Sequence, residues 1–348
     1  MRDDKSMAAE EFTNAHPALA EFWHPVALSS EVGREPVAVR LGGQGWALAR
    51  FSDGIAAFAD ACPHRRARLS AGQLAGGTLQ CTYHGWRFAR DGRCVEIPAL
   101  EDTAVLPERA TLSQPAGVAE QDGMVWLAPK PPRAPIPDLR PEPRPEAPLG
   151  GDGIATVFLP VVEVEANAAL LIDNFLDEAH FPFVHAATIG GAGPEPIPRA
   201  EIDRRDLSFT AVREHTFTNL SDPAVRDGTR PAIQRRRMTY RYQAPLTATL
   251  LLEFLDADGW LFLTFTAQPA DERRCRLYQT ATGPGLADPE QAESAVKYEM
   301  SILEEDLDLQ RRALSGLEFP LDLAAELHTR ADRVSVEFRR VLAAAISG

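Results

Sequence analysis

Two short segments of the sequence each combine one cysteine with one histidine. Residues 62–65 read Cys-Pro-His-Arg, and residues 81–86 read Cys-Thr-Tyr-His-Gly-Trp. Each pair sits beside a Pro or a Gly that favours a tight turn, so the two segments can present two thiolates and two imidazoles to one site. Cys62, His64, Cys81 and His84 are therefore predicted to bind a single metal centre.

The mixture of ligands within each segment limits the kind of centre. Structural zinc sites usually pair Cys with Cys and His with His. A Rieske [2Fe-2S] cluster needs the mixture, because two His replace two Cys on one iron and raise the reduction potential. We predict a Rieske cluster, with a structural zinc site or unrelated buried residues as the alternatives. Cys94 and Cys275 lack such partners and are interpreted as ordinary buried thiols.

A second polar group lies in residues 174–185, which read Asn-Phe-Leu-Asp-Glu-Ala-His-Phe-Pro-Phe-Val-His. Pro182 disfavours the α conformation at Phe181, so we expect the helix to bend or stop between His180 and His185. That break would let the two imidazoles converge. Two His and one carboxylate on one face of Fe(II) leave positions open for O2. A core histidine with satisfied hydrogen bonds is the alternative for either residue alone.

These motifs resemble those of the Rieske non-haem iron oxygenases. Cys-x-His, sixteen intervening residues and Cys-x2-His-Gly-Trp resemble the family's Rieske domain, and Asn-x2-Asp-x2-His-x4-His resembles its mononuclear-iron motif. The resemblance implies that His180 and His185 bind iron. It also implies that Asp177 hydrogen-bonds an iron-ligand His while contacting His84 of a neighbouring subunit. Asp177 and Asn174 are accordingly assigned to catalysis, with a helix-surface Asp as the alternative for Asp177.

In this family the third iron ligand lies on a late helix, so the candidate carboxylate falls within residues 294–314. On a helical projection Asp306 lies inside the apolar arc, Glu305 points to the opposite face, Glu304 lies among charged residues, and Glu299 shares the arc. A buried acid is costly unless it is paired or bound to a metal. We predict Asp306 as the ligand, supported by the resemblance in Glu305-Asp306-x3-Gln310. Glu299 is the fallback, and a buried salt bridge is the alternative.

Composition excludes several other classes of protein. The net charge of −14 over 348 residues argues against a nucleic-acid partner, and four cysteines are too few for a secreted disulfide scaffold of this length. No apolar run is long enough to span a membrane, and the first residues lack the order of a signal peptide. We therefore expect a cytoplasmic protein without membrane or nucleic-acid partners.

Residue patterns predict two domains that position these motifs, and an α+β fold overall. After an N-terminal lead, 1–20, residues 21–130 read as short strands, with two-residue hairpin signals at Asp91-Gly92 and Asp122-Gly123. A proline-rich linker, 131–150, precedes a catalytic domain, 151–348. The latter reads as a strand at 155–164, a helix at 166–179, a meander with strands at 247–255, 260–267 and 274–281, and late helices. The resemblance implies an all-β Rieske domain followed by a helix-grip domain.

The resemblance implies the terminal oxygenase of a multicomponent monooxygenase, which hydroxylates or O-/N-demethylates a small aromatic or cyclic substrate with O2. This chain is similar in length to the vanillate and dicamba demethylase type of the family. The resemblance also implies two cofactors, a [2Fe-2S] cluster and a mononuclear Fe(II). It implies a separate reductase or ferredoxin that brings electrons from NAD(P)H through a flavin, and a homotrimer. The alternatives are a ring-cis-dihydroxylating dioxygenase of the family, a hydrophobic-ligand carrier with a Rieske domain, and a Rieske electron carrier. Alternation predicts that the substrate lies against Leu250, Leu252, Phe254 and Phe262, with a well-packed core as the alternative for most of them.

Overall fold

The computed structural model describes residues 11–101, 105–142, 149–190, 193, 196–218, 223–257 and 259–347. These residues form two compact units. The small unit comprises Ala15–Pro137 and Gln268–Glu272, and the large unit comprises Asp138–Ala267, Arg273–Gly348 and the residues before Ala15. Parts of the predicted lead and linker, 1–10 and 143–148, lie outside the described residues. The boundaries 1–20, 21–130, 131–150 and 151–348 stay predictions.

The small unit is built from short antiparallel strands in three sheets. They are β3 (Val37–Leu41), β4 (Gln44–Phe51) and β5 (Gly54–Ala59); β10 (Gly117–Gln121), β11 (Met124–Ala128) and β2 (His24–Leu28); and β6 (Gln73–Ala75), β7 (Thr78–Gln80), β8 (Arg87–Phe88) and β9 (Cys94–Glu96). Short 3-10 turns connect them at η1 (Pro17–Glu21), η2 (Ser29–Glu31) and η3 (Leu69–Ala71).

The hairpin signals differ in how closely the structure follows them. Asp122 and Gly123 form a two-residue loop between β10 and β11, because Gln121 pairs with Met124. Both have positive φ, 51° and 73°, as a type I′ turn requires. Asp91 and Gly92 also lie in a turn, but the flanking strands end at Phe88 and resume at Cys94, so that loop is longer than two residues.

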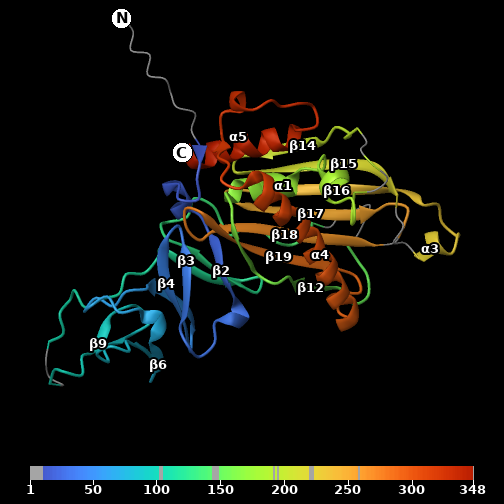
Figure 1. Ribbon diagram of the computed structural model, residues 1–348. Coiled ribbons are helices and arrows are strands. Elements are labelled where there is room, and N and C mark those ends of the chain that lie inside the picture. Colours follow the sequence, from blue (N-terminus) through green and yellow to red (C-terminus); the bar gives the residue numbers. More distant parts are fainter. Residues whose placement is uncertain are drawn as a thin grey trace, which may run out of the picture. The chain divides into compact units, whose positions relative to one another are not determined.

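The large unit is organised around one eight-stranded sheet (Figure 1). Its strand order is β12-β19-β18-β17-β16-β15-β14, and β13 also pairs with β19. The bounds are β12 (Ala155–Phe158), β13 (Val162–Glu165), β14 (Glu201–Arg205), β15 (Ser208–Thr218), β16 (Ile233–Gln243), β17 (Thr247–Phe254), β18 (Trp260–Pro269) and β19 (Arg274–Gly283). A separate two-stranded pair joins β1 (Glu11–Phe12) to β20 (Phe319–Pro320).

The meander predicted for residues 247–281 is present as β17, β18 and β19, which are neighbours in the sheet. The strand predicted for 155–164 is wrong in one respect, since it is divided into β12 and β13. Pro160 lies between them and has no N–H to donate to a neighbouring strand. Both pieces pair with β19, so the chain continues along the same edge after the interruption.

Besides its strands, the large unit contains helices, several of which pack on the sheet or against one another. They are α1 (Ala168–Leu176), α2 (Phe181–Val184), α3 (Pro223–Arg226), α4 (Pro289–Leu309), a π-helical turn η4 (Gln310–Leu314), a 3-10 turn η5 (Leu323–Ala325) and α5 (Arg333–Ser347). Figure 1 shows α4 running across the strands of the sheet, and Met300 of α4 packs against the same buried apolar cluster as Leu261 and Leu263 of β18. A long helix held against an antiparallel sheet is the predicted helix-grip arrangement.

The C-terminal helix fixes the helix that precedes the second motif. Arg339 of α5 is buried, and its guanidinium donates a hydrogen bond to Asp173 of α1 at 2.8 Å and another to Glu326 at 2.7 Å. Charge-assisted bonds of this kind hold a helix in one orientation. Within the described residues, no helix is long and apolar enough to cross a membrane.

Candidate metal centres and cavity

The small unit brings its two Cys-His segments onto adjacent loops. The thiols of Cys62 and Cys81 are buried in the same apolar cluster, each about 2% exposed. His64 and His84 are exposed, and their ring centroids lie 4.4 Å apart. All four predicted cluster residues therefore gather at one place, with sulfur toward the core and imidazole toward the surface.

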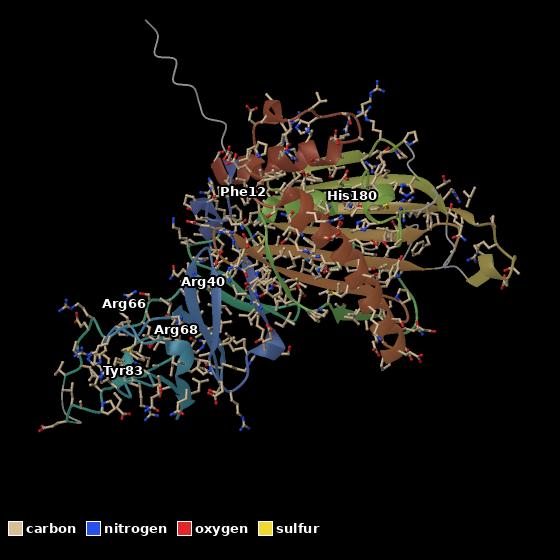
Figure 2. The ribbon with its side chains drawn as sticks, viewed as in Figure 1. Phe12, Arg40, Arg66, Arg68, Tyr83 and His180 are labelled. Atoms are coloured by element: carbon tan, nitrogen blue, oxygen red, sulfur yellow. The ribbon has the colours of Figure 1, made fainter. Side chains whose placement is uncertain are left out.

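Turn geometry explains how short segments achieve this. The Gly85 N–H donates to the Cys81 carbonyl at 3.0 Å, and Gly85 has φ of 72° with Pro98 only 3.1 Å from where a Cβ would stand. In the other loop Arg66 donates its N–H to the Cys62 carbonyl, with φ of 57°. Arg66 and Tyr83, both labelled in Figure 2, lie at the surface of this unit.

The donor set fits a Rieske cluster. Burial raises the pKa of the Cys62 thiol to about 11, an effect partly offset by the backbone N–H of His64. A thiol in such a place loses its proton when it binds a cationic metal centre. Trp86 stacks on His64 with ring centroids 4.7 Å apart and planes 6° apart, which holds one imidazole in place. Sequence reasoning gave Trp86 no role of its own.

The second motif gathers in the large unit. His180 and His185 flank the single turn of α2, and their Nε2 atoms are 3.2 Å apart. Asp306 of α4 directs Oδ1 toward both, 3.1 Å from His185 Nε2 and 3.6 Å from His180 Nε2. The ligand atoms of these three residues all lie within 4.8 Å of one another. His180 is labelled in Figure 2.

The backbone between the two histidines differs from the expectation. The helix predicted for 166–179 ends earlier, at Leu176, and a new helical turn begins at Phe181. Pro182 stands in the first turn of α2, where a missing N–H has no cost, so it starts a helix instead of ending one. The predicted break between the histidines is wrong, because the break precedes His180.

Hydrogen bonds define the protonation of both imidazoles. Asp177 Oδ2 accepts from His180 Nδ1 at 2.7 Å and from the His180 backbone N–H at 3.0 Å. Glu305 Oε2 accepts from His185 Nδ1 at 2.8 Å and from the Thr188 hydroxyl at 2.7 Å. A proton fixed at each Nδ1 leaves each Nε2 as a lone pair facing the other ring.

The three facing atoms suit a metal ion better than they suit one another. Asp306 Oδ1 is buried and accepts no hydrogen bond in the described part of the chain. Two ligand atoms about 2.1 Å from one ion and at right angles to each other are about 3 Å apart, close to the observed separations. Two imidazoles and one carboxylate are the donor set of non-haem Fe(II) sites. The residues therefore fit a mononuclear iron.

The neighbouring charges and hydrogen bonds shift the pKa values of His185 and Asp177 toward their ionised forms. Burial alone lowers the pKa of His185, but the close carboxylates of Asp306 and Glu305 outweigh it, and the net shift is upward. Burial alone would raise the pKa of Asp177, but its bond to His180 and the backbone N–H groups reverse the effect, and the pKa is lowered. Asp177 is thus held as a carboxylate beside His180.

The prediction that Glu305 points away from the site is wrong. Consecutive residues of a helix project about 100° apart, and the His185 ring lies between the directions in which Glu305 and Asp306 project from α4. The short side chain of Asp306 meets the Nε2 edge of the ring, and the longer side chain of Glu305 reaches the Nδ1 edge. A helical projection gives the direction of a Cβ atom but not the reach of the side chain.

A cavity of about 750 Å³ opens beside this cluster. Its wall is mostly apolar, with Leu159, Phe175, Phe217, Met238, Leu250, Leu252, Phe254, Leu261, Leu263, Phe265 and Leu303 among its residues. Asn174 also lines it, together with Arg236, Tyr240, Gln279 and Glu299. The cavity offers a hydrophobic compound a place next to His180, His185 and Asp306.

Of two residues singled out in the sequence, Phe262 lies outside the cavity wall and Glu299 lies within it. Phe262 does not line the cavity, because Leu250 pairs with Leu263 and Leu251 pairs with Phe262, which puts Phe262 on the opposite face of the sheet with Leu251. Glu299 does line the cavity, but within the described part of the chain it forms no hydrogen bond or ion pair with either histidine. Burial raises its pKa to about 7.

Comparison with known proteins agrees with these features. A family described as the vanillate O-demethylase oxygenase C-terminal domain matches residues 164–348, and the Rieske [2Fe-2S] domain matches residues 22–107. Methylxanthine N3-demethylase NdmB of Pseudomonas putida is 29% identical over 337 residues, covering 92% of this chain and 88% of that protein. The dicamba O-demethylase oxygenase component of Stenotrophomonas maltophilia is 35% identical over 172 residues, 47% of each chain.

A solved structure gives the same result for the fold. Pseudomonas putida CBB5 NdmB superposes with a TM-score of 0.77 at 26% identity, covering 95% of this chain and 92% of that one. The matched Rieske domain contains both Cys-His loops, and the matched C-terminal domain contains His180, His185 and Asp306. The chain therefore belongs to the Rieske non-haem iron oxygenases, oxidoreductases that use O2, in the family with the vanillate O-demethylase oxygenase C-terminal domain.

Proposed function

We propose that this chain is the terminal oxygenase of a multicomponent monooxygenase that hydroxylates, or O- or N-demethylates, a small cyclic compound. The observation that carries the proposal is the convergence of His180, His185 and Asp306 on the wall of an apolar cavity. Relatives named as N- and O-demethylase components support the reaction type. In demethylation, hydroxylation of a methyl on O or N gives a hemiacetal or hemiaminal, which releases formaldehyde.

In this proposal His180, His185 and Asp306 hold the mononuclear iron, which when bound supplies the activation of O2. Asp177 and Glu305 each keep a proton on an Nδ1, so that both Nε2 lone pairs remain free for the metal. The apolar wall excludes water and holds the ring of the substrate. Asn174 lines the same cavity, where its amide can orient the substrate.

Electron supply is the second part of the proposal. Cys62, His64, Cys81 and His84 hold the [2Fe-2S] cluster, whose electrons come from NAD(P)H through the flavin of a separate reductase, with or without a ferredoxin. We further propose a cytoplasmic homotrimer in which Asp177 of one subunit contacts His84 of the next, so that electrons pass between subunits. The exposure of the His84 ring in a single chain supports this role.

Metal content and formaldehyde release together test the function. The purified protein should hold about three irons per chain, of which two accompany acid-labile sulfide. With a surrogate reductase it should release formaldehyde from a methylated cyclic compound in an aromatic, N-methyl and steroid-like panel. His180→Ala and His185→Ala should each lose about one iron per chain and all activity while keeping the Rieske paramagnetic signal. His328→Ala, a histidine of the large unit away from the cavity, should lose neither. Retained activity in either cavity variant would exclude the proposed iron site.

A further inference from the structure

One charged side chain in the cavity wall plays no part in holding iron. Strand β16 alternates its side chains between the two faces of the sheet, so Arg236, Met238 and Tyr240 face the cavity. Arg235 and Arg237, on the other face, are both paired, with Asp256 at 2.7 Å and Glu214 at 2.5 Å. Arg236 is the arginine of this strand that contributes to the cavity wall.

The direct partners of Arg236 carry no negative charge. Its Nε donates to His215 Nε2 at 2.6 Å, and its guanidinium lies 4.6 Å from the centre of the Phe217 ring. Burial, together with the charges of Arg236 and Arg213, lowers the pKa of His215 to about 4, so His215 is a neutral acceptor. Among the described residues, no carboxylate lies within ion-pair distance of Arg236, and its two Nη groups donate to none of them.

Glu178, the buried acid whose charge acts on Arg236, already has a cation of its own. Glu178 Oε1 accepts from Arg213 Nη1 at 2.5 Å, and both side chains are about 95% buried. Arg213 and Arg236 both feel the single negative charge of Glu178, but only Arg213 is ion-paired with it, so one positive charge of the three groups remains uncompensated. Glu299 lies in the same cavity, but burial is the cause of its raised pKa and no contribution from Arg236 accompanies it. It is not the counter-ion of Arg236.

A half-buried guanidinium with free donors in an apolar cavity is costly unless an anion meets it. Its two Nη groups form a planar fork that matches a carboxylate with two parallel hydrogen bonds. We propose that Arg236 binds a carboxylate of the substrate, so that the enzyme acts on a methylated ring acid and not on a neutral ring. This inference rests on the proposed function. The acid group lies at Arg236, and the methyl group extends along the apolar wall toward His180, His185 and Asp306.

Binding without turnover tests the inference. The holoenzyme, kept anaerobic and without reductant, is titrated by calorimetry with two acid and amide pairs: para-methoxybenzoate with para-methoxybenzamide, and methoxynaphthoate with methoxynaphthamide. Acid and amide have nearly the same shape but differ in charge. We expect at least one acid to bind about tenfold or more tighter than its amide, as charge-assisted hydrogen bonds to a buried guanidinium require.

Variants then assign that preference to one residue. Arg236→Met should reduce the acid-to-amide ratio of affinities to about one or invert it, and Arg236→Lys, which keeps the charge, should keep the preference with weaker binding. Arg235→Met removes the same charge from the opposite face of the strand and should leave the ratio unchanged. Thermal unfolding of each variant identifies any that fail to fold, and the Lys variant alone still decides the role of the charge.

The outcomes separate this inference from the proposed function. Equal binding of acid and amide by the parent protein, no binding of any acid, or an unchanged ratio in Arg236→Met would overturn the inference. Formaldehyde release from neutral methylated compounds, with no preference for acids, would overturn it while leaving the oxygenase intact. An acid preference that depends on Arg236, in a protein that releases no formaldehyde, would support the anion site and reject the demethylase reaction.

Discussion

Glu305 and Asp306 are adjacent in the chain, yet they meet opposite edges of one imidazole ring. A proton at Nδ1 of His185 is held by Glu305, and the Nε2 lone pair faces Asp306. The hydrogen bond from Nδ1 to Glu305 fixes the tautomer and orientation of the ring, so that the ring presents its Nε2 lone pair to a metal. Two neighbouring carboxylates thus have separate tasks, one as a proposed ligand and one as a positioning residue.

Glu305→Gln should weaken metal binding without unfolding the protein. The amide keeps an acceptor oxygen for His185 Nδ1 but loses the negative charge, and a change of this kind next to a ligand costs about 10- to 100-fold in metal affinity. The affinity is measured by titrating iron-depleted protein with Co(II) and following the absorbance of the bound ion. Glu304→Gln, whose parent side chain is ion-paired with Arg311 at 2.5 Å, is the matched control and should bind Co(II) like the parent. Equal affinities in both variants would deny Glu305 its role.

Arg66 occupies a backbone conformation that costs most side chains free energy. Its φ of 57° lies in the left-handed region, where an L-residue is less stable than glycine by about 1–2 kcal/mol. We expect Arg66→Gly to leave unchanged or raise the temperature at which the cluster's visible absorbance is lost, and Arg66→Val to lower it. Arg34→Gly, at an exposed position without positive φ, should bring no gain. A lower temperature for Arg66→Gly would show that the arginine side chain stabilises its loop.

At the scale of elements, the segment from α1 to α2 decides where the site forms. Asp177 ends α1, and its two oxygens accept from the backbone N–H groups of Ala179 and His180, which turns the chain before α2 begins. The same carboxylate accepts from the His180 ring. One side chain therefore shapes the backbone and orients a proposed ligand, so its replacement affects both.

Asp177→Asn should separate electron transfer from metal binding. The amide retains an acceptor for the His180 backbone, so we expect both metal centres to fill, while turnover coupled to the reductase is abolished. Iron and sulfide content and the Rieske paramagnetic signal measure the first part, and product formed per NAD(P)H consumed measures the second. Asp173→Asn, four residues earlier in α1 and bonded to Arg339, tests for a general effect of helix damage. Unimpaired turnover in Asp177→Asn would refute the bridge between subunits.

The sequence predicts an element well where neighbouring residues determine it, and less well where contacts with distant residues do. The strands predicted at 247–255, 260–267 and 274–281 and the loop at Asp122-Gly123 follow from neighbouring residues alone, and the structure has them. Alternation puts Phe262 on the wrong face, because it fixes which residues share a face within one strand but not the register between strands. The sequence around Pro182 is ambiguous, because the same residue ends one helix or begins another according to where the helix starts.

The candidate site shows the same division. The spacing of His180 and His185 and the apolar arc around Asp306 led to residues that the structure brings together. Arg236 gave no signal, because nothing local distinguishes it from Arg235 and Arg237 on the same strand. Arg236 lacks an ion-pair partner because Glu178 is paired with Arg213, and this pairing brings together residues that are far apart in the sequence.

At the scale of the whole molecule, buried histidines make stability depend on acidity. His24 is 1% exposed, its ring N–H donates to the Leu19 carbonyl at 2.8 Å, and burial lowers its pKa from 6.5 to about 4. Between these two values the unfolded chain binds a proton that the folded chain does not. Stability is therefore full above pH 6.5 and falls as the pH drops toward 4, by roughly 3 kcal/mol for this one group.

His24→Gln should flatten that dependence. Glutamine can still donate to the Leu19 carbonyl but does not titrate, so the urea midpoint of the small unit should change less between pH 6.5 and pH 4 than it does in the parent. The cluster's visible absorbance follows unfolding of this unit. His16→Gln, in the preceding turn, should keep the parent's dependence. A slope equal to the parent's in His24→Gln would mean that other groups control acid unfolding.

The distance along the chain between His180 and Asp306 has a consequence for how the protein is made. A nascent chain synthesised as far as the end of β19 contains both histidines, while the helix that carries the carboxylate has not yet been synthesised. Metallation at the proposed iron site is for that reason a late, post-translational event.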